Sequence, residues 1–104
     1  MKERIKVHLY NRTIKEIELS DYSYISEDIF SNRSDIVKVE FPEGVEEIGN
    51  HAFENCVNLE EVICPKSLKR IGESAFEDCI NLKKVEGVSD VEVAPTAFKG
   101  CYNM

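Results

Sequence analysis

A segment of about 23 residues repeats along this chain, and this repeat constrains the fold more than any other feature of the sequence. Residues 37–61 are followed directly by residues 62–84, and their apolar positions match phase for phase. A third copy follows at a spacing of 22 residues, and an outline of the same pattern precedes the first. A fixed period of this length is typical of a solenoid, because each unit cannot bury its apolar face alone and stacks on its neighbours. The matched positions are Ile48, Phe53, Cys56, Leu59 and Val62 in one copy, Ile71, Phe76, Cys79, Leu82 and Val85 in the next, Val93, Phe98, Cys101 and Met104 in the third, and Ile25, Phe30, Ile36 and Val39 before them.

Each repeat unit predicts two extended pieces and about one helical turn. In the second unit apolar residues alternate at Val39 and Phe41, which favours a strand half buried on the core. Pro42 follows and ends the strand, because proline lacks a donor N–H. A second short extended piece leads to Gly49, where the absence of a side chain permits a sharp backbone turn. The residues around Phe53 are then expected to form the helical turn.

The 104 residues fit a single domain, with an N-terminal cap at residues 1–16 before the repeats. Apolar residues alternate strictly along residues 4–9, which indicates a hairpin of strands 4–9 and 13–19. We expect the first of these strands to cover the exposed edge of the solenoid sheet, because uncovered edges attract other chains. Four repeats are placed at about residues 17–38, 39–61, 62–84 and 85–104.

The C-terminal end shows no cap of this kind. Residues 82–87 are expected to form the final parallel strand, and the coil containing Phe98 should carry apolar surface on which no further coil stacks. Asp90, Glu92 and Lys99 add charge that can keep such an edge soluble. The sequence leaves open a monomer, a partner that supplies the missing coil, and a homodimer through the C-terminal end, for which two-fold pairing is the default geometry.

Composition narrows the classes of partner. The net charge of −7, from 20 acidic and 13 basic residues, argues against direct binding of nucleic acid, because phosphate contacts need a basic patch. No run of about 18 apolar residues is present, so membrane insertion is not expected. The N-terminal residues lack the apolar segment of a secretory signal. We therefore expect a cytoplasmic protein, or a cell-surface protein if this chain is a piece of a longer exported one.

Three of the four cysteines share one repeat phase and are expected to form a column inside the stack. Neighbouring coils lie about 4.8 Å apart, so a disulfide between coils is geometrically feasible, although three thiols cannot pair completely. Buried cysteine otherwise behaves as a small hydrophobe, and buried free thiols are the interpretation favoured here. Cys64 should also point inward. No CxxC or HxxxH spacing is present, so neither a zinc site nor any other cofactor is expected.

Charged residues at fixed phases form columns on the outer face of the expected sheet. If Val39 and Phe41 point inward, Lys38 and Glu40 point outward, and the same phases recur in every strand. The first column, Glu16, Lys38, Glu61 and Lys84, alternates in sign and is interpreted as a charge ladder between strands. The second, Glu18, Glu40, Ile63 and Glu86, is interpreted either as a contact surface for a protein partner or as a solvated face. A third, Glu47, Arg70 and Glu92, is interpreted as structural. The predicted partner-binding residues are Glu18, Lys38, Glu40, Glu61, Ile63, Lys84 and Glu86.

Catalytic residues are not predicted. No nucleophile elbow, phosphate loop or HExxH motif is present, and a thin solenoid offers little concave volume, so we do not expect an enzyme. Asn58, Asn81 and Asn103 recur at one phase, and a buried or turn ladder is the preferred interpretation, because asparagine hydrogen-bonds nearby backbone.

The runs IGNHAFENCVNL and IGESAFEDCINL, each preceded by a strand that ends in proline, resemble the BspA-type leucine-rich repeats. The resemblance covers about residues 14–104. It implies a right-handed solenoid with a parallel sheet on one side. Together with the helical turns expected from the repeat residues, the predicted fold class is an α/β solenoid. It also implies protein binding and, in many members, attachment at the cell surface.

Three functions are compatible with these features. The first is a protein–protein interaction module that binds through the sheet face. The second is a small acidic intracellular inhibitor of a basic protein, such as one that binds nucleic acid. Added salt should steeply weaken the binding of such a partner. The third is a fragment of a cell-surface adhesin.

Overall fold

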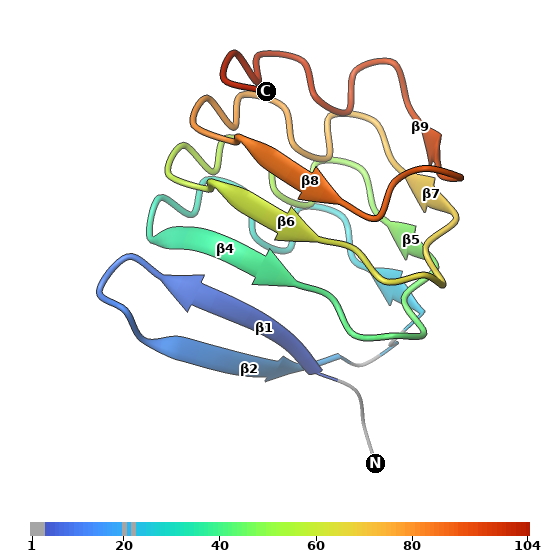
Figure 1. Cartoon of the computed structure of the whole chain (residues 1–104), viewed down its shortest axis with the longest axis horizontal. Coiled ribbons are helices and arrows are strands. Elements are labelled where there is room, and N and C mark those ends of the chain that lie inside the picture. The colour runs from blue at the N-terminus through green and yellow to red at the C-terminus, as the bar shows by residue number, and fades with distance from the viewer. Residues whose placement is uncertain (1–3, 20, 22) are drawn as a thin grey trace.

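The computed structural model describes residues 4–19, 21 and 23–104. Residues 1–3 of the expected cap, and Ser20 and Tyr22 of the first expected repeat, lie outside the described residues. The chain forms a β-solenoid of about three turns that carries two sheets on different sides (Figure 1). Its principal extents are 36 × 32 × 21 Å. The predicted solenoid is therefore confirmed.

The larger sheet has five strands in the order β2 (Ile14–Glu18), β1 (Arg4–Leu9), β4 (Ile36–Glu40), β6 (Glu61–Ile63) and β8 (Lys84–Glu86). The last three strands are parallel, and each comes from a successive coil. β1 and β2 form an antiparallel hairpin, and β1 pairs antiparallel with β4. The predicted hairpin, with its first strand on the edge of the solenoid sheet, is confirmed.

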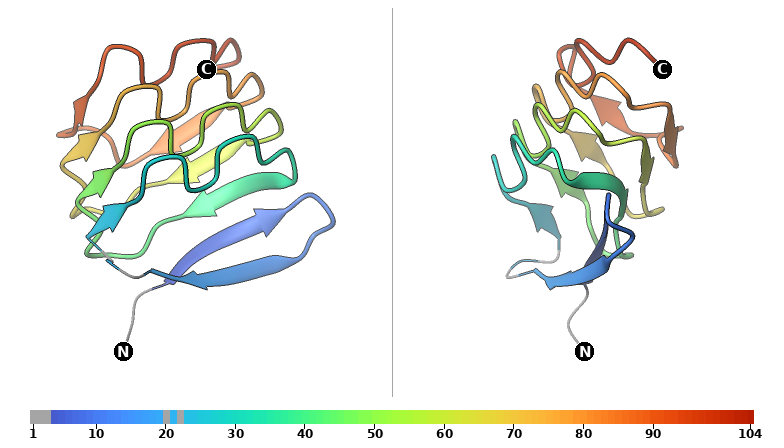
Figure 2. Two further views of the ribbon diagram at one scale, coloured as in Figure 1. Left: turned by 180° about the vertical axis from the view of Figure 1, so that it is seen from behind. Right: turned by 90° about the vertical axis from the view of Figure 1, so that its left-hand side faces the viewer.

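The smaller sheet has four parallel strands of two residues each: β3 (Tyr24–Ile25), β5 (Glu47–Ile48), β7 (Arg70–Ile71) and β9 (Glu92–Val93). The predicted third column, Glu47, Arg70 and Glu92, lies in register across it. Figures 1 and 2 show the chain passing along one sheet, returning along the opposite side and climbing one coil in a right-handed sense.

The expected helical turns are wrong, and with them the α/β class, because the described residues contain no helix. The third side of each coil is instead a series of turns, here named the turn ladder, at residues 26–34, 49–57, 72–80 and 94–102. His51 and Asn55 have φ angles of 61° and 61°, and the two equivalent residues of the neighbouring coils are also left-handed. A helix cannot continue through left-handed residues four positions apart. Asparagine, aspartate and glycine tolerate this conformation, and they occupy the second of these phases as Asn32, Asn55, Asp78 and Gly100.

Backbone hydrogen bonds of the turn ladder alternate between bonds to a neighbouring coil and bonds within the same coil. The N–H groups of His51, Phe53 and Asn55 donate to carbonyls of the next coil at 2.9, 2.7 and 2.7 Å. The intervening residue Glu54 donates within its own coil, to the carbonyl of His51 at 3.2 Å. Alternate donation of this kind satisfies the backbone without a helix and ties adjacent coils together.

Gly49 and Gly72 have a role different from the one expected. Neither has a left-handed φ angle, so they do not serve a special turn. A Cβ atom on Gly49 would lie 2.5 Å from the carbonyl oxygen of Ile25, and one on Gly72 would lie 3.0 Å from that of Ile48. Glycine is needed here because each coil approaches the one before it closely.

A stack of phenylalanine rings runs through the core. Phe30, Phe53, Phe76 and Phe98 come from successive coils, with centroids separated by 5.1, 5.2 and 5.3 Å. The rings of Phe53 and Phe76 are fully buried, whereas Phe98 is partly exposed because no coil of the described residues stacks on its outer side. The repeat phase read from the sequence therefore identifies the core correctly.

All four cysteines are free, and three of them form the predicted column. The thiols of Cys56, Cys79 and Cys101 donate to the carbonyls of Phe30, Phe53 and Phe76 in the preceding coil, at 3.1, 3.2 and 3.0 Å. Cys56 and Cys79 are fully buried as expected, and Cys101 is half-buried because it belongs to the last coil. Cys64 points inward as predicted, and burial raises the pKa of its thiol to about 12.

Candidate functional site

The outer face of the five-stranded sheet is the surface on which the predicted partner-binding residues lie. Ile5, Val7, Val39 and Val62 are buried beneath it. Because strand side chains alternate between faces, the residues between them project outward. Strand register then arranges these outward residues in rows that cross the sheet.

The first row contains Ile14, His8, Lys38, Glu61 and Lys84. Lys38 and Glu61 form an ion pair, with Nζ and Oε1 separated by 3.6 Å. This pair is the one that a charge ladder between strands predicts. Lys84 departs from that pattern, because its ammonium lies 2.8 Å from Oε1 of Glu86 in the same strand.

The second row contains Glu16, Lys6, Glu40, Ile63 and Glu86. The first residue of each of two predicted columns, Glu16 and Glu18, was placed wrongly, because β1 inserts between β2 and β4. Glu16 is opposite Lys6 rather than beside Lys38, and Glu18 is opposite Arg4 at 3.8 Å rather than beside Glu40. The insertion places cations next to the acidic column, so this part of the face is less acidic than expected.

Glu40 makes the shortest contact between charged or titratable side chains described on this face. Its Oε2 lies 2.6 Å from Nε2 of His8, and the two side chains retain 35% and 23% of their exposed surface. The hydrogen bond with His8 lowers the pKa of Glu40 from 4.5, although partial burial opposes this effect. Ile63 lies beside Glu40 in the register, between it and Glu86.

An open hollow of about 540 Å³ indents one end of this face. It lies where the tip of the β1–β2 hairpin meets the starts of β4 and β6. Tyr10 and Ile14 line it and are 76% and 56% exposed. Its full lining is His8, Leu9, Tyr10, Arg12, Ile14, Val37, Lys38, Glu60 and Glu61.

Two charged residues at the hollow have no partner among the side chains of residues 4–19, 21 and 23–104. Arg12 lies in the hairpin turn with a φ angle of 71°, and its guanidinium makes no ion pair with them. The carboxylate of Glu60 precedes β6 and is likewise unpaired within this set. The hollow therefore offers one available cation, one available anion and exposed apolar surface together.

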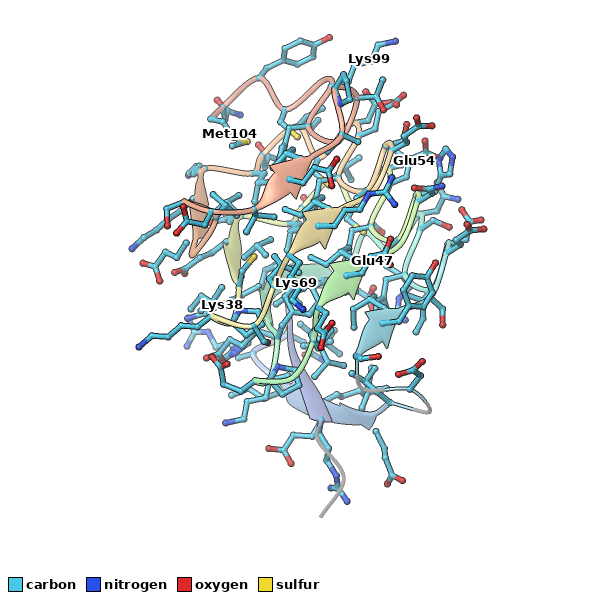
Figure 3. The ribbon with its side chains drawn as sticks, turned by 90° about the vertical axis from the view of Figure 1, so that its right-hand side faces the viewer. Lys38, Glu47, Glu54, Lys69, Lys99 and Met104 are labelled. Carbon is cyan, nitrogen blue, oxygen red and sulfur yellow. The ribbon has the colours of Figure 1, made fainter. Side chains whose placement is uncertain are left out.

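Carboxylates gather on the turn ladder rather than on the sheet face. This side carries Glu27, Asp28, Glu54, Glu73, Glu77 and Asp78 against Arg33 and Lys99. Figure 3 shows Lys38 and Glu54 at opposite margins of the molecule, with Glu47 of the small sheet between them. Asn58, Asn81 and Asn103 lie just after the turn ladder and form the predicted ladder of asparagines, in which each side-chain amide donates to a carbonyl of the preceding coil at 2.7, 2.8 and 2.6 Å.

Sequence reasoning did not select several residues of this face. The alternation of residues 4–9 predicts that Lys6 and His8 point outward. It does not predict that they lie beside Glu40, because the register between distant strands is a tertiary property. Tyr10 and Arg12 lie in the cap, outside the repeat. Glu60 lies in a repeat, but its residue type does not recur at the equivalent positions, Val37 and Lys83.

The arrangement favours recognition over covalent chemistry. The two histidines each contact a glutamate, and within the described chain neither bonds to a hydroxyl or thiol group. The described residues contain no group of three or more His, Cys, Asp or Glu that could hold a metal ion. No helix among them is long and apolar enough to cross a membrane.

Comparison with known proteins gives one match. The family model for the BspA type leucine-rich repeat region matches residues 4–104 in six copies. No curated protein and no solved structure matches the chain.

Proposed function

Because the chain belongs to the BspA-type leucine-rich-repeat family, we propose that it is a protein-interaction module that binds its partner through the outer face of the five-stranded sheet. Members of such repeat families are commonly interaction or adhesion modules and are typically not enzymes. The observation that carries the proposal is the hollow of about 540 Å³ on this face, with Tyr10 and Ile14 exposed in its lining.

The chemistry of the hollow defines the partner segment. An apolar side chain of the partner fills the space beside Tyr10 and Ile14, because burial of exposed apolar surface is the main source of binding energy. A carboxylate of the partner pairs with Arg12, and a cation pairs with Glu60. The segment continues along the sheet over the predicted contact residues, Glu18, Lys38, Glu40, Glu61, Ile63, Lys84 and Glu86.

Selection from a library of random peptides displayed on phage tests this proposal, with the immobilised chain as bait. We expect enriched peptides to carry an apolar residue between an acidic and a basic one. Fluorescence anisotropy then measures binding of a labelled enriched peptide to Ile14→Asp and Arg12→Glu. Each substitution is expected to weaken binding at least tenfold, about 1.4 kcal/mol.

Matched controls lie on other sides of the molecule. Ile29→Asp changes an isoleucine on the turn ladder that is 39% exposed, and Arg70→Glu changes an arginine of the small sheet. Both are expected to bind the peptide as the wild type does. Equal affinity of Ile14→Asp and the wild type, or enrichment no greater than on a bare surface, would reject the hollow as the binding site.

The acidic turn ladder favours a second candidate function, inhibition of a basic protein. Glu73, Glu77 and Asp78 lie close in sequence on this side, and Glu54 precedes them by one coil. A labelled oligolysine peptide serves as the probe. Binding that falls steeply with added salt and is lost in Glu73→Gln/Glu77→Gln/Asp78→Asn supports this candidate, and binding insensitive to salt contradicts it.

A further inference from the structure

The last coil leaves one edge of each sheet without a neighbour in the described chain. β8 is the terminal strand of the five-stranded sheet, and β9 is the terminal strand of the small sheet. Figure 1 shows both strands, with the final turns of the chain, at one end of the solenoid. This end also exposes apolar side chains, with Val93 38% exposed, Tyr102 83% and Met104 58%.

The backbone of β8 presents hydrogen-bonding groups at this edge. The N–H of Lys84 donates to the carbonyl of Glu60, and the carbonyl of Glu86 accepts the N–H of Cys64. Both residues therefore direct their backbone groups toward β6. Because alternate residues of a strand direct these groups to opposite edges, Val85 directs its N–H and C=O outward.

The side chains of β8 are self-complementary about Val85. Lys84 and Glu86 flank it on the outer face, with opposite charges at equal distance along the strand. If two β8 strands pair antiparallel with Val85 opposite Val85, each Lys84 faces Glu86 of the other copy. Opposite charges directly across an antiparallel pair are stabilising, and like charges are destabilising.

We propose that the chain forms a two-fold homodimer through the edge of β8, which joins the two five-stranded sheets into one. The two Val85 residues exchange reciprocal backbone hydrogen bonds, and two Lys84–Glu86 ion pairs form between copies. A closed two-fold pairing buries the β8 edge of each copy against that of the other, so association through this edge stops at two copies.

Light scattering across a range of concentrations, with purified chain alone, tests the proposal. We expect a mass that approaches twice that of the chain as concentration rises. Lys84→Glu places Glu opposite Glu86 of the other copy, and Glu86→Lys places Lys opposite Lys84. Each variant is expected to raise the dimer dissociation constant at least tenfold.

Charge exchange separates loss of pairing from loss of folding. The double variant Lys84→Glu/Glu86→Lys restores opposite charges across the two-fold axis and is expected to dimerise. An equimolar mixture of the two single variants restores them between unlike copies and is expected to form a heterodimer. Glu61→Lys is the matched control, because it creates like-charge neighbours on the same face, away from the edge, and should leave the dimer intact.

Three results would overturn the proposal. The first is a wild-type mass that stays that of one chain as concentration rises. The second is a dimer dissociation constant that the single charge reversals leave unchanged, and the third is a mass that grows beyond that of two chains. The measurement needs no partner protein, so its failure is distinct from failure of the proposed sheet-face site.

Discussion

At the scale of single residues, side chains in this protein bond across coils at fixed repeat phases. The amide of Asn81 donates to the carbonyl of Val57, and the thiol of Cys79 to that of Phe53. The hydroxyl of Ser67 donates to the carbonyl of Val45, at 2.8 Å. Each bond satisfies a carbonyl of one coil with a donor from the next, so these residues stabilise stacking rather than the coil that carries them.

The side chains of His8 and Glu40 make a contact between the cap and the repeats, and this contact has a defined pH dependence. The folded state lowers the pKa of Glu40 below 4.5, so its contribution to stability is present above about pH 4.5 and is lost as pH falls through the folded pKa. Glu40→Gln is expected to lower the free energy of unfolding by about 0.5 kcal/mol near pH 7, the range of partly exposed pairs. The difference between variant and wild type should shrink toward pH 3.

Urea denaturation at the two pH values measures this effect. His8→Gln is the matched variant, and the double variant His8→Gln/Glu40→Gln should cost little more than either single change, because both remove one interaction. Additive costs in the double variant, or a difference that does not change with pH, would show that the 2.6 Å contact does not stabilise the fold.

At the scale of elements, the turn ladder shows why close stacking of coils restricts residue type. Left-handed residues prevent a helix, and the N–H groups so released bond to the next coil. Gly49 lies at the start of this element, where the carbonyl of Ile25 leaves no room for a Cβ atom.

Gly49→Ala is expected to destabilise the protein by about 1–3 kcal/mol, as overpacking does. The sign of the change in the free energy of unfolding is the test. At an unstrained position a glycine-to-alanine change ordinarily stabilises a protein, because alanine restricts the unfolded chain. Thermal or urea denaturation measures the change. Ala94→Gly is the matched control at the same phase, where a Cβ atom is already accommodated, and should cost less than about 1 kcal/mol. A stabilised Gly49→Ala would show that neighbouring coils separate at little cost.

At the scale of the whole molecule, stability depends on where a residue lies along the solenoid axis. Phe53 has a ring neighbour on each side, whereas Phe98 stacks on Phe76 alone among the described residues. In a repeat protein each unit is stabilised chiefly by contacts with adjacent units. The middle coils should therefore contribute more than the last coil.

Phe53→Ala is expected to cost about 3–5 kcal/mol, the usual range for a fully buried ring. Phe98→Ala should cost about 1–2 kcal/mol, because the ring is already partly exposed. Urea denaturation of both variants, at a concentration where light scattering gives the mass of one chain, measures the difference. Equal costs would mean that the terminal coil is as tightly packed as the middle ones.

The repeat phase predicts the solenoid and the buried positions, and the strict alternation of residues 4–9 predicts the hairpin that covers the sheet edge. The repeat phase succeeds because burial in a stacked repeat follows directly from apolar residues that recur at one period, as Phe53 and Phe76 do. The helical turns were mispredicted, although the recurrence of Asn32, Asn55 and Asp78 at one phase carried the signal for left-handed residues. The sequence also predicts the cluster of carboxylates on the turn ladder, once the residues that form this side of the solenoid are known.

Tertiary structure alone decided which residues share the candidate site. Antiparallel insertion of β1 placed Lys6 and His8 beside Glu40 and moved Glu18 to the far edge. The hollow likewise depends on how the hairpin tip meets β4 and β6, and the repeat does not encode that contact. The physical reason is that the period determines only pairings between equivalent residues of successive coils. The cap lies outside the period, so its register, and with it the chemistry of the sheet face, follows from packing.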